Sequence, residues 1–389
     1  MRTQIAIVGG GPSGMLLAHL LHAAGIDTVV IEQRTRSYVL DRVRAGVLEH
    51  GSVELLRSVG VGDRMDREGF VHDGTELSNN GRGFRVDFKA TAGRSVMVYG
   101  QTEVQKDLYD VGDTKGLLVY DDCADVTVHD PTSNMPAVSF TKNGQAHRVN
   151  ADFIAGCDGF HGICRTVFPP SMVTEFERVY PFGWLGILSE TPPVSHELIY
   201  ARHPDGFALC SMRNPMLSRY YIQCTSDTKA GDWSDQQFWD ALRQRLPAEA
   251  AESMVIGPSI EKSVTPLRSY VREPLRYGNL FLAGDSAHIV PPTGAKGLNL
   301  AFSDIFYLSR ALVEHYDERS NAGLDHYSAT ALKRVWKAVR FSWWMTTMLH
   351  TFPDQTDFDH RMQETELDYL ATSPAAKAAM AEQYCGIPY

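Results

Sequence analysis

Residues 5–14 read Ile5-Ala6-Ile7-Val8-Gly9-Gly10-Gly11-Pro12-Ser13-Gly14, an apolar segment followed directly by a glycine-rich one. The apolar part has the length and composition of a short strand buried on both faces. A helix is predicted over residues 13–24, with Gly25 at the position where helices commonly stop. A second apolar strand is predicted over 28–31. The order strand, helix, strand predicts an α/β fold that opens on a parallel sheet.

The glycines of this stretch have the spacing GxGxxG, with Gly9, Gly11 and Gly14 as its three members. Glycines at a strand-to-helix turn let a pyrophosphate approach the helix N-terminus, where free N–H groups favour anions. Glu32 lies at the end of the second predicted strand, 18 positions after Gly14, where a carboxylate can bind a ribose diol. The pattern therefore predicts a dinucleotide site that also includes Ser13. A tight turn without a ligand is the alternative, and the pattern does not separate FAD from NAD.

Composition narrows the class of protein. The chain has 389 residues and a formal net charge of −10, which argues against nucleic acid or an anionic membrane as a partner. No apolar run approaches the length of a membrane span, and no secretion signal is recognisable. The six cysteines lack metal-binding spacing, so no metal site is expected and the thiols are interpreted as reduced. These features predict a soluble cytoplasmic enzyme.

The rest of the chain divides into regions of different pattern. Residues 1–174, continued at about 267–328, are predicted to form the nucleotide-binding α/β domain. Residues 175–266 have short alternating segments with turn signals, which predicts an inserted, mostly antiparallel β-sheet domain. Residues 329–389 are predicted to be helical, and their aromatic stretch at 341–345 is interpreted as core or as a subunit interface.

Two predicted strands of the inserted sheet carry candidate ligand-binding side chains. If residues 207–213 and 219–223 are extended, Ser211 and Arg213 share one face, as do Arg219 and Tyr221. A guanidinium binds a carboxylate with two parallel hydrogen bonds, so this arrangement suits an aromatic acid. Spacing alone leaves the alternative open that these are surface arginines and half-buried tyrosines on a solvated sheet.

Two later motifs repeat the pattern of a strand followed by a glycine and an aspartate. They are Gly156-Cys157-Asp158-Gly159 and Leu282-Ala283-Gly284-Asp285. Together with GxGxxG they resemble the class A flavoprotein aromatic hydroxylases. Segments 41–47, 98–104, 179–186 and 288–299 resemble the branch of that family that acts on 4-hydroxybenzoate, and the resemblance extends over essentially the whole chain.

The resemblance implies an FAD-dependent monooxygenase of aromatic catabolism. It would use NAD(P)H and O2, through a flavin C4a-hydroperoxide, to convert 4-hydroxybenzoate to 3,4-dihydroxybenzoate (protocatechuate). It implies further FAD contacts and a structural role for Asp158 at the cofactor groove. The implied FAD contacts are Arg42, Arg44, Gln101, Asp285, Leu298 and Asn299.

The resemblance also assigns a substrate pocket and a proton relay. The implied substrate contacts are Tyr200, Ser211, Arg213, Tyr221 and Pro292. The substrate phenol would lose its proton through Tyr200, Tyr384 and His72, and Arg219 would act in a movement of the flavin. Read without the resemblance, His72 would be expected at the surface.

The nicotinamide nucleotide has no separate domain in this family. The resemblance implies contacts with Arg34, Tyr38, Arg42, Arg44, His161 and Arg268. Gln33 departs from the usual arginine, while Arg34 and Arg36 replace uncharged residues. NADPH is therefore the expected co-substrate, with NADH or dual use left open. A homodimer is also implied.

Three alternatives to this interpretation remain at this stage. One is a flavin dehydrogenase or reductase that transfers hydride without inserting oxygen. Another is a hydroxylase of a different hydroxybenzoate or of an aminobenzoate. The third is a binding protein that keeps the flavoprotein fold but has lost its cofactor.

Overall fold

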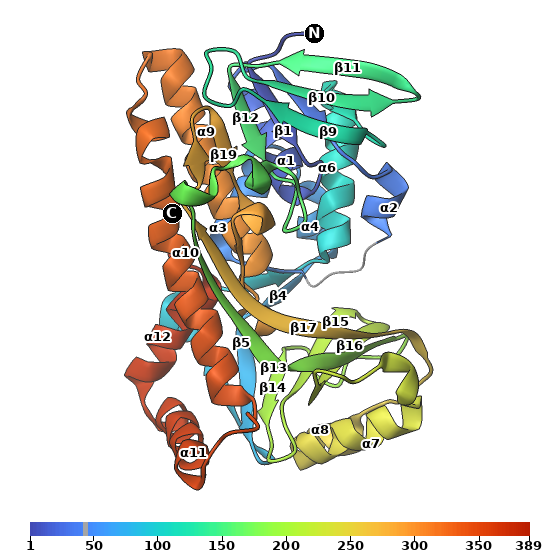
Figure 1. Ribbon diagram of the computed structural model, residues 1–389. Helices are drawn as coiled ribbons and strands as arrows, with labels where there is room; N and C mark the ends of the chain where they lie inside the picture. Colours follow the sequence, from blue (N-terminus) through green and yellow to red (C-terminus); the bar gives the residue numbers. More distant parts are fainter. Residues whose placement is uncertain (42–45) are drawn as a thin grey trace.

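The computed structural model describes residues 1–41 and 46–389. A six-stranded sheet occupies the upper part of Figure 1, with the predicted strand β1 (Ile5–Val8) in its interior. β1 is parallel to both of its neighbours, and all four of its residues are buried. The sheet order is β18 (Arg276–Tyr277), β19 (Leu280–Leu282), β12 (Phe153–Gly156), β1, β2 (Thr28–Ile31) and β8 (Leu118–Tyr120).

Three helices pack together beside this sheet. α1 (Pro12–Ala23) contacts both α6 (Gln101–Lys115) and α9 (Gly297–Glu318). α1 is the helix predicted after the glycine-rich turn and follows β1 directly, and α9 packs against η4 (Gly284–Ser286), which follows the carboxyl end of β19. The N-termini of α1 and α9 therefore lie at the edge where an α/β sheet binds its ligands.

An eight-stranded sheet forms the lower part of the molecule (Figure 1). Its pairs are antiparallel except for β14 with β5. The order is β20 (His288–Ile289), β17 (Ser259–Glu273), β13 (Thr174–Ser189), β16 (Leu217–Thr225), β15 (Ala208–Asn214), β14 (Ile199–Arg202), β5 (Gly74–Asn79) and β6 (Arg82–Asp87). β5 and β6 come from inside the first predicted domain, so the sheet draws on a wider part of the chain than residues 175–266. The predicted α/β class with a mostly antiparallel sheet and a helical C-terminal region is confirmed.

The two faces of the large sheet are covered differently. Tyr220 and Cys210 face α7 (Asp235–Arg245) and pack with Phe238 and Trp239 in one apolar cluster. The opposite face belongs to a second cluster that includes residues of α10 (Ala322–Leu349) and α12 (Pro374–Cys385). Strand alternation decides which side chain lies on which face, and it directs Tyr200 toward the face that α10 and α12 cover.

Long elements connect the upper and lower parts. β13 and β17 extend from one to the other, and α10 runs alongside both parts (Figure 1). β13 pairs with β17 from Thr174 to Ser189, with a register shift after Val179. No helix in the described ranges is both long and apolar enough to cross a membrane.

Smaller elements complete the described chain. Two three-stranded sheets are formed by β9 (Ala124–His129), β10 (Ala137–Lys142) and β11 (Gln145–Asn150), and by β3 (Val47–Leu48), β7 (Val96–Val98) and β4 (Phe70–His72). The remaining helices are α2 (Arg36–Leu40), α3 (His50–Ser58), α4 (Asp63–Glu68), α5 (Phe88–Ala92), α8 (Ala248–Ser253) and α11 (Asp357–Thr372). Short 3-10 turns are η1 (Cys164–Val167), η2 (Pro170–Met172), η3 (Ala230–Asp232), η4 (Gly284–Ser286) and η5 (Pro292–Gly294).

Candidate active site

The glycine-rich turn packs closely against neighbouring backbone at two of its glycines. Gly9 has φ +107°, and a Cβ placed on it would lie 2.3 Å from the carbonyl oxygen of Cys157. A Cβ on Gly14 would lie 1.9 Å from the carbonyl oxygen of Gly9. Gly11 differs, since a Cβ there would meet no atom within 4 Å. Gly9 and Gly14 thus serve the packing of the turn, whereas Gly11 borders open space at the start of α1.

Glu32 is held at the end of β2 by two backbone N–H groups. Its carboxylate accepts hydrogen bonds from Gly10 N at 2.6 Å and from Arg34 N at 2.7 Å. A carboxylate has further lone pairs, so both oxygens can still accept hydrogen bonds from a ribose diol. α6 supports the same turn, because Gln105 Nε2 and Tyr109 Oη both donate to the carbonyl oxygen of Gly10 at 2.9 Å. The predicted Gln101 is the first residue of that helix.

The two later glycine–aspartate motifs meet the first one in space. A Cβ on Gly284 would lie 2.9 Å from Ser13 Oγ, so η4 and its exposed Asp285 lie beside the glycine turn. Asp158 accepts a hydrogen bond from Cys164 N at 2.9 Å, and burial raises the pKa of its carboxyl group. Asp158 therefore orders the turn that follows β12, which is the kind of structural role the resemblance implied.

The N-terminus of α9 has no side-chain cap. Its first intrahelical hydrogen bond joins Leu300 N to Lys296 O at 2.8 Å, which leaves the N–H groups of 297–299 without intrahelical acceptors. The Asn299 side chain is buried and fully engaged: its Oδ1 accepts from Glu49 N and Ser52 Oγ, and its Nδ2 donates to Val47 O and Ala295 O, all at 2.8 Å. Any contact of Asn299 with a cofactor would therefore come from its backbone.

Two buried tyrosines meet on the face of the large sheet that α10 and α12 cover. Tyr200 from β14 and Tyr384 from α12 have their hydroxyl oxygens 2.7 Å apart, and either can be the donor. They are 1% and 2% exposed, and burial raises the pKa of both phenols. Both are therefore neutral at physiological pH, so each hydroxyl can donate one proton while accepting another.

Arg213 presents an unsatisfied guanidinium on the same sheet. Its Nε and one terminal nitrogen are shielded from solvent, yet they have no hydrogen-bond partner among the described residues. Burial lowers the pKa of Arg213, but an arginine remains charged at neutral pH. A buried cation with unpaired donors is costly, so this arrangement favours an anionic ligand.

Arg219 and Tyr221 lie next to this position on β16. The strand register pairs Ser211 with Arg219 and Leu209 with both Tyr200 and Tyr221. Arg219 is anchored to β17 by Glu261 at 2.9 Å and Ser263 Oγ at 3.0 Å, and it lies over the Tyr221 ring at 5.2 Å. The structure thus brings Tyr200, Tyr221 and Ser211 to one region of the sheet.

His72 and Pro292 are less closely connected to this region. His72 lies on β4, is fully buried, and has both ring nitrogens without a hydrogen-bond partner in the described ranges. The expectation of a surface histidine was therefore wrong, because β4 is covered by the loop that carries His196, whose ring lies 5.0 Å away. Burial lowers the pKa of His72 to about 4. Pro292 is exposed at the start of η5.

The expected nicotinamide contacts fall into two groups. His161 and Arg268 come together around Phe160, whose ring lies 5.1 Å from the His161 ring and 5.0 Å from the Arg268 guanidinium. Arg34 is exposed and lies over the Tyr38 ring at 5.1 Å. Arg42 and Arg44 lie outside the described residues.

Arg36 differs from Arg34. Its guanidinium pairs with Asp113 at 2.5 Å and with Asp110 at 3.2 Å, and it stacks over the Tyr109 ring at 4.6 Å. These contacts hold Arg36 against α6. Of these two arginines, Arg34 is consequently the one whose charge is available to a nucleotide phosphate.

Sequence reasoning missed a buried charge cluster at the N-terminus of α9. Lys296 Nζ bonds to Glu49 Oε1 at 2.6 Å, and Arg334 bonds to Glu49 Oε2 at 2.9 Å. Lys296 and Glu49 are 4% and 5% exposed at their side chains. The partners are hundreds of positions apart in the chain, so no local pattern could have identified them.

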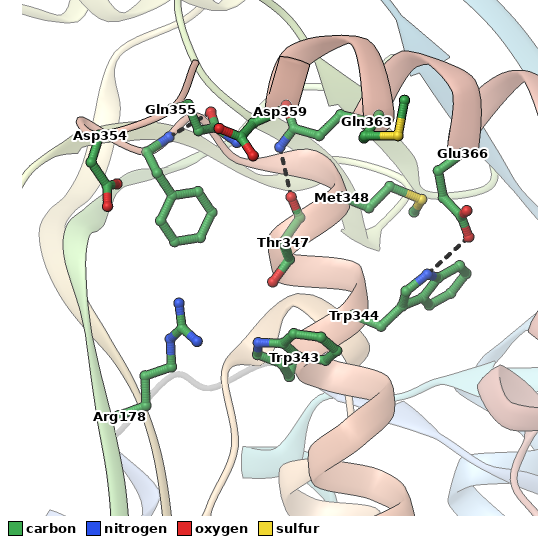
Figure 2. Close-up of a pocket in the computed structure, with 12 residues that line it drawn as sticks. Arg178, Trp343, Trp344, Thr347, Met348, Asp354, Gln355, Asp359, Gln363 and Glu366 are labelled. Carbon is green, nitrogen blue, oxygen red and sulfur yellow. Dashed lines mark hydrogen bonds between the residues drawn. The ribbon is translucent and has the colours of Figure 1, made fainter. Parts of the chain in front are cut away.

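A cavity of about 410 Å³ lies elsewhere, between α10 and α11 (Figure 2). Aromatic and acidic side chains line it together with Arg178 from β13. Its walls are already bonded to each other: Trp344 Nε1 donates to Glu366 at 3.0 Å, and Gln363 Nε2 donates to Thr347 O at 2.6 Å. None of the expected site residues lines this cavity.

The nucleotide side of the site fits FAD. The open space at Gly11 and the N–H groups at the start of α1 suit the pyrophosphate. The N–H groups at the start of α9 suit the negative charge of the reduced flavin ring, and the Glu32 carboxylate suits a ribose. Next to it, Arg213 and the tyrosine pair match a ligand that carries both a carboxylate and a phenol.

Comparison with known proteins agrees with this geometry. The family described as "FAD binding domain" matches residues 2–342. The chain is 53% identical over 390 aligned positions to the p-hydroxybenzoate hydroxylase of Acinetobacter baylyi, covering 100% of this chain and 96% of that protein. It is 25% identical to a rifampicin monooxygenase of Streptomyces venezuelae, covering 84% of this chain and 67% of that one.

A solved structure confirms the fold. The p-nitrophenol 4-monooxygenase of Pseudomonas putida superposes with a TM-score of 0.83 at 16% identity, covering 100% of both chains. At that identity the likeness concerns the fold alone. The family match and the full-length relative carry more, and they show that this chain belongs to the FAD binding domain family, among the class A flavoprotein hydroxylases that include p-hydroxybenzoate hydroxylase.

Proposed function

We propose that this protein hydroxylates 4-hydroxybenzoate at the carbon next to its hydroxyl group, using FAD, NAD(P)H and O2, and releases 3,4-dihydroxybenzoate. The observation that carries the proposal is an arginine with shielded guanidinium nitrogens, unpaired among the described residues, on the same sheet as Tyr200, whose buried hydroxyl meets that of Tyr384 from α12. The first suits a carboxylate and the second suits a phenol. The name of the full-length relative points to the same substrate.

The dimensions of the sheet support a para-substituted ring. Tyr200 lies opposite Leu209 in the register, and Arg213 follows Leu209 by four residues on the same strand. Four residues of a strand span about 13 Å. A guanidinium and a hydroxyl at the two ends of this span suit the carboxylate and the phenol of a single para-substituted benzene ring.

The protein's part in the reaction follows from these side chains. When bound, FAD supplies the redox chemistry, namely uptake of hydride from NAD(P)H and activation of oxygen. Arg213 holds the carboxylate, and Tyr200 Oη accepts the phenol proton while passing its own proton to Tyr384 Oη. A phenol has a pKa of about 10, and lowering it by two units requires about 2.7 kcal/mol, which is within the range of a buried hydrogen-bond network. The phenolate is the electron-rich form that an electrophilic oxygen attacks.

The remaining expected contacts extend the proposal. His72 continues the relay toward solvent, Ser211, Tyr221 and Pro292 line the substrate pocket, and Arg219 acts in movement of the flavin. Arg34 and Tyr38, with His161 and Arg268, receive NADPH. Because Arg34 is exposed and has no ion-pair partner among the described residues, we propose NADPH as the preferred co-substrate.

Location and assembly belong to the same proposal. We propose a cytoplasmic enzyme, since the reaction consumes NAD(P)H and the six cysteines are free thiols. We also propose a homodimer that buries exposed aromatic and apolar side chains of β13 and α10. Phe176 and Trp336 are 45% and 38% exposed with their rings 5.2 Å apart, and Trp343 at the cavity of Figure 2 is 41% exposed.

The test uses the purified flavoprotein. Its visible spectrum, its NADPH and NADH oxidation with and without 4-hydroxybenzoate, and its product are measured together. We expect a yellow protein whose NADPH oxidation rises with substrate and yields 3,4-dihydroxybenzoate. Benzoate, which lacks the phenol, should yield no hydroxylated product. Flavin binding without any dihydroxy product would overturn the substrate, and a preference for 3-hydroxybenzoate or 4-aminobenzoate would replace it.

A further inference from the structure

The last residues of the chain are held by an unusual set of cationic side chains. α12 ends at Cys385, one residue after Tyr384, and Gly386 follows with φ +98°. The carbonyl groups at the end of a helix have no intrahelical donors and need other partners. Here lysine and arginine side chains from three distant elements supply them.

Lys296 binds the end of α12 from the N-terminus of α9. Its Nζ donates to the carbonyl oxygens of Gln383 and Tyr384 at 2.5 and 2.9 Å. Its charge is balanced by Glu49, which lies 2.6 Å away. The backbone of Tyr384 is therefore tied to the helix whose N-terminus faces the flavin side of the site.

Arg94 and Arg334 bind the next carbonyl groups. Arg94 uses one nitrogen, which donates to Gly386 O at 2.8 Å. Arg334 uses two: Nη1 donates to Ile387 O, and Nη2 donates to Glu49 Oε2 at 2.9 Å. Arg334 also lies over the Tyr389 ring at 4.6 Å.

The space around this segment allows little displacement. A Cβ on Gly386 would lie 2.3 Å from Glu49 Oε2, and a Cβ on Gly51 would lie 2.9 Å from the Tyr389 ring. The Tyr384 ring stacks on Phe88 at 4.8 Å, next to the loop that carries Arg94. From this place the hydroxyl of Tyr384 lies 2.7 Å from that of Tyr200.

We propose that Arg94 and Arg334 are positioning residues of the phenol proton relay: by holding the carbonyl groups of Gly386 and Ile387, they fix the Tyr384 hydroxyl at hydrogen-bond distance from Tyr200. The proposal rests on the hydroxylation proposed above. Neither arginine is among the expected substrate or cofactor contacts, and both act through the backbone of the C-terminal segment.

The test measures ionisation of the bound substrate in the FAD-loaded enzyme. Ultraviolet difference spectra of bound 4-hydroxybenzoate against pH give the apparent pKa of its phenol. For Arg94→Met and Arg334→Met we expect this pKa to rise by about one unit, a tenfold smaller phenolate ratio. The Kd of the substrate should change by less than about threefold, because Arg213 is untouched.

Conservative variants sharpen the expectation. Arg94→Lys should restore the wild-type titration, because a single donor suffices for Gly386 O. Arg334→Lys should restore it only in part, because one ammonium has to replace a two-nitrogen bridge between Ile387 O and Glu49. Arg340→Met is the matched control: Arg340 is exposed and, within residues 1–41 and 46–389, its one hydrogen bond is to the side chain of Gln383 at 2.9 Å, so the titration should not move.

A double variant separates positioning from a general loss of stability. In a Tyr384→Phe background, Arg94→Met should cause no further shift, since the hydroxyl it positions is gone. Additive shifts, or a wild-type titration in both methionine variants, would overturn the positioning role while leaving hydroxylation intact. A wild-type enzyme that binds FAD but forms no product from 4-hydroxybenzoate would overturn the proposed function and the relay role together.

Discussion

At the scale of single residues, Arg213 has the surroundings that most clearly require a ligand. Arg213 and Arg219 each have two guanidinium nitrogens that are shielded from solvent without a hydrogen-bond partner in the described ranges, but of the two only Arg219 also forms an ion pair with Glu261 and a hydrogen bond with Ser263. Two arginines of one sheet thus have different roles that their spacing does not reveal. The paired one is anchored, and the unpaired one is available to bind an anion.

The first prediction concerns this difference. Arg213→Met should raise the Kd of 4-hydroxybenzoate by about 100-fold, since a buried charge-assisted pair contributes about 3 kcal/mol to binding. Arg213→Lys should fall between wild type and Arg213→Met, because it keeps the charge but loses the planar fork. Titration of the flavin absorbance with substrate measures both. Unchanged affinity in Arg213→Met would show that the carboxylate binds elsewhere.

At the scale of elements, the turn between β1 and α1 assigns separate tasks to its glycines. Gly9 and Gly14 let backbone segments approach closely, and Gly11 leaves space in front of the helix N-terminus. The same GxGxxG pattern therefore contains positions that the fold needs and one that a ligand needs.

A pair of alanine variants tests that division. Gly14→Ala should destabilise the protein by about 3 kcal/mol or more, since its Cβ would overlap backbone. Gly11→Ala should fold with a nearly unchanged Tm but bind FAD about tenfold more weakly, because the methyl group would occupy the approach to the pyrophosphate. Thermal unfolding of the apoprotein and FAD titration separate the two effects. Full FAD affinity in Gly11→Ala would argue against a pyrophosphate at this turn.

At the scale of the whole molecule, α10 and the paired strands β13 and β17 unite the part built on the six-stranded sheet with the part built on the eight-stranded sheet (Figure 1). The tyrosine pair depends on this union, since one tyrosine comes from the large sheet and the other from the C-terminal helix. His288 on β20 is buried and pairs with Asp304 at 2.6 Å, whereas the buried His19 on α1, His72 on β4 and His350 after α10 have no carboxylate partner in the described ranges.

These histidines predict the response of the whole molecule to acid. Burial lowers the pKa of His19 to about 4 and that of His350 to about 3, from an ordinary value of 6.5. Between pH 6.5 and the lowered values, the unfolded chain binds protons that the folded chain does not. The free energy of unfolding should therefore fall as the pH drops through this window, by up to about 3 kcal/mol for His19.

Urea unfolding of the apoprotein between pH 4.5 and 7 measures this dependence, because that pH range covers most of the interval between 6.5 and the lowered pKa values. His19→Gln can keep the hydrogen bond to Leu108 O, which lies 2.8 Å from the histidine Nε2, but it removes the titrating group. The variant should lose less stability than wild type on acidification, with a slope smaller by up to one proton. Equal slopes would mean that His19 is protonated in the folded state as well.

Much of the fold and part of the site could be predicted from local sequence. The apolar segments 5–8 and 28–31 predicted β1 and β2 with the bounds that the structure has, because a buried parallel strand must be apolar at every position. The helix after the glycines was predicted within one residue, because glycine, proline and apolar periodicity act over a few positions. FAD and the family followed from three motifs of the same local kind.

The assembly of the active site was decided only by tertiary structure. Sequence spacing left the arginine and tyrosine roles open, placed His72 at the surface, and contained no sign of the Glu49, Lys296 and Arg334 cluster. Several of those features depend on pairs far apart in the chain, such as Tyr200 with Tyr384 at 184 positions and Glu49 with Arg334 at 285 positions. The sequence by itself determined the helices and strands and the cofactor class, because those depend on local patterns. Burial and hydrogen-bond partners are properties of the packed chain, so only the tertiary structure decided which charges are paired and which can bind a ligand.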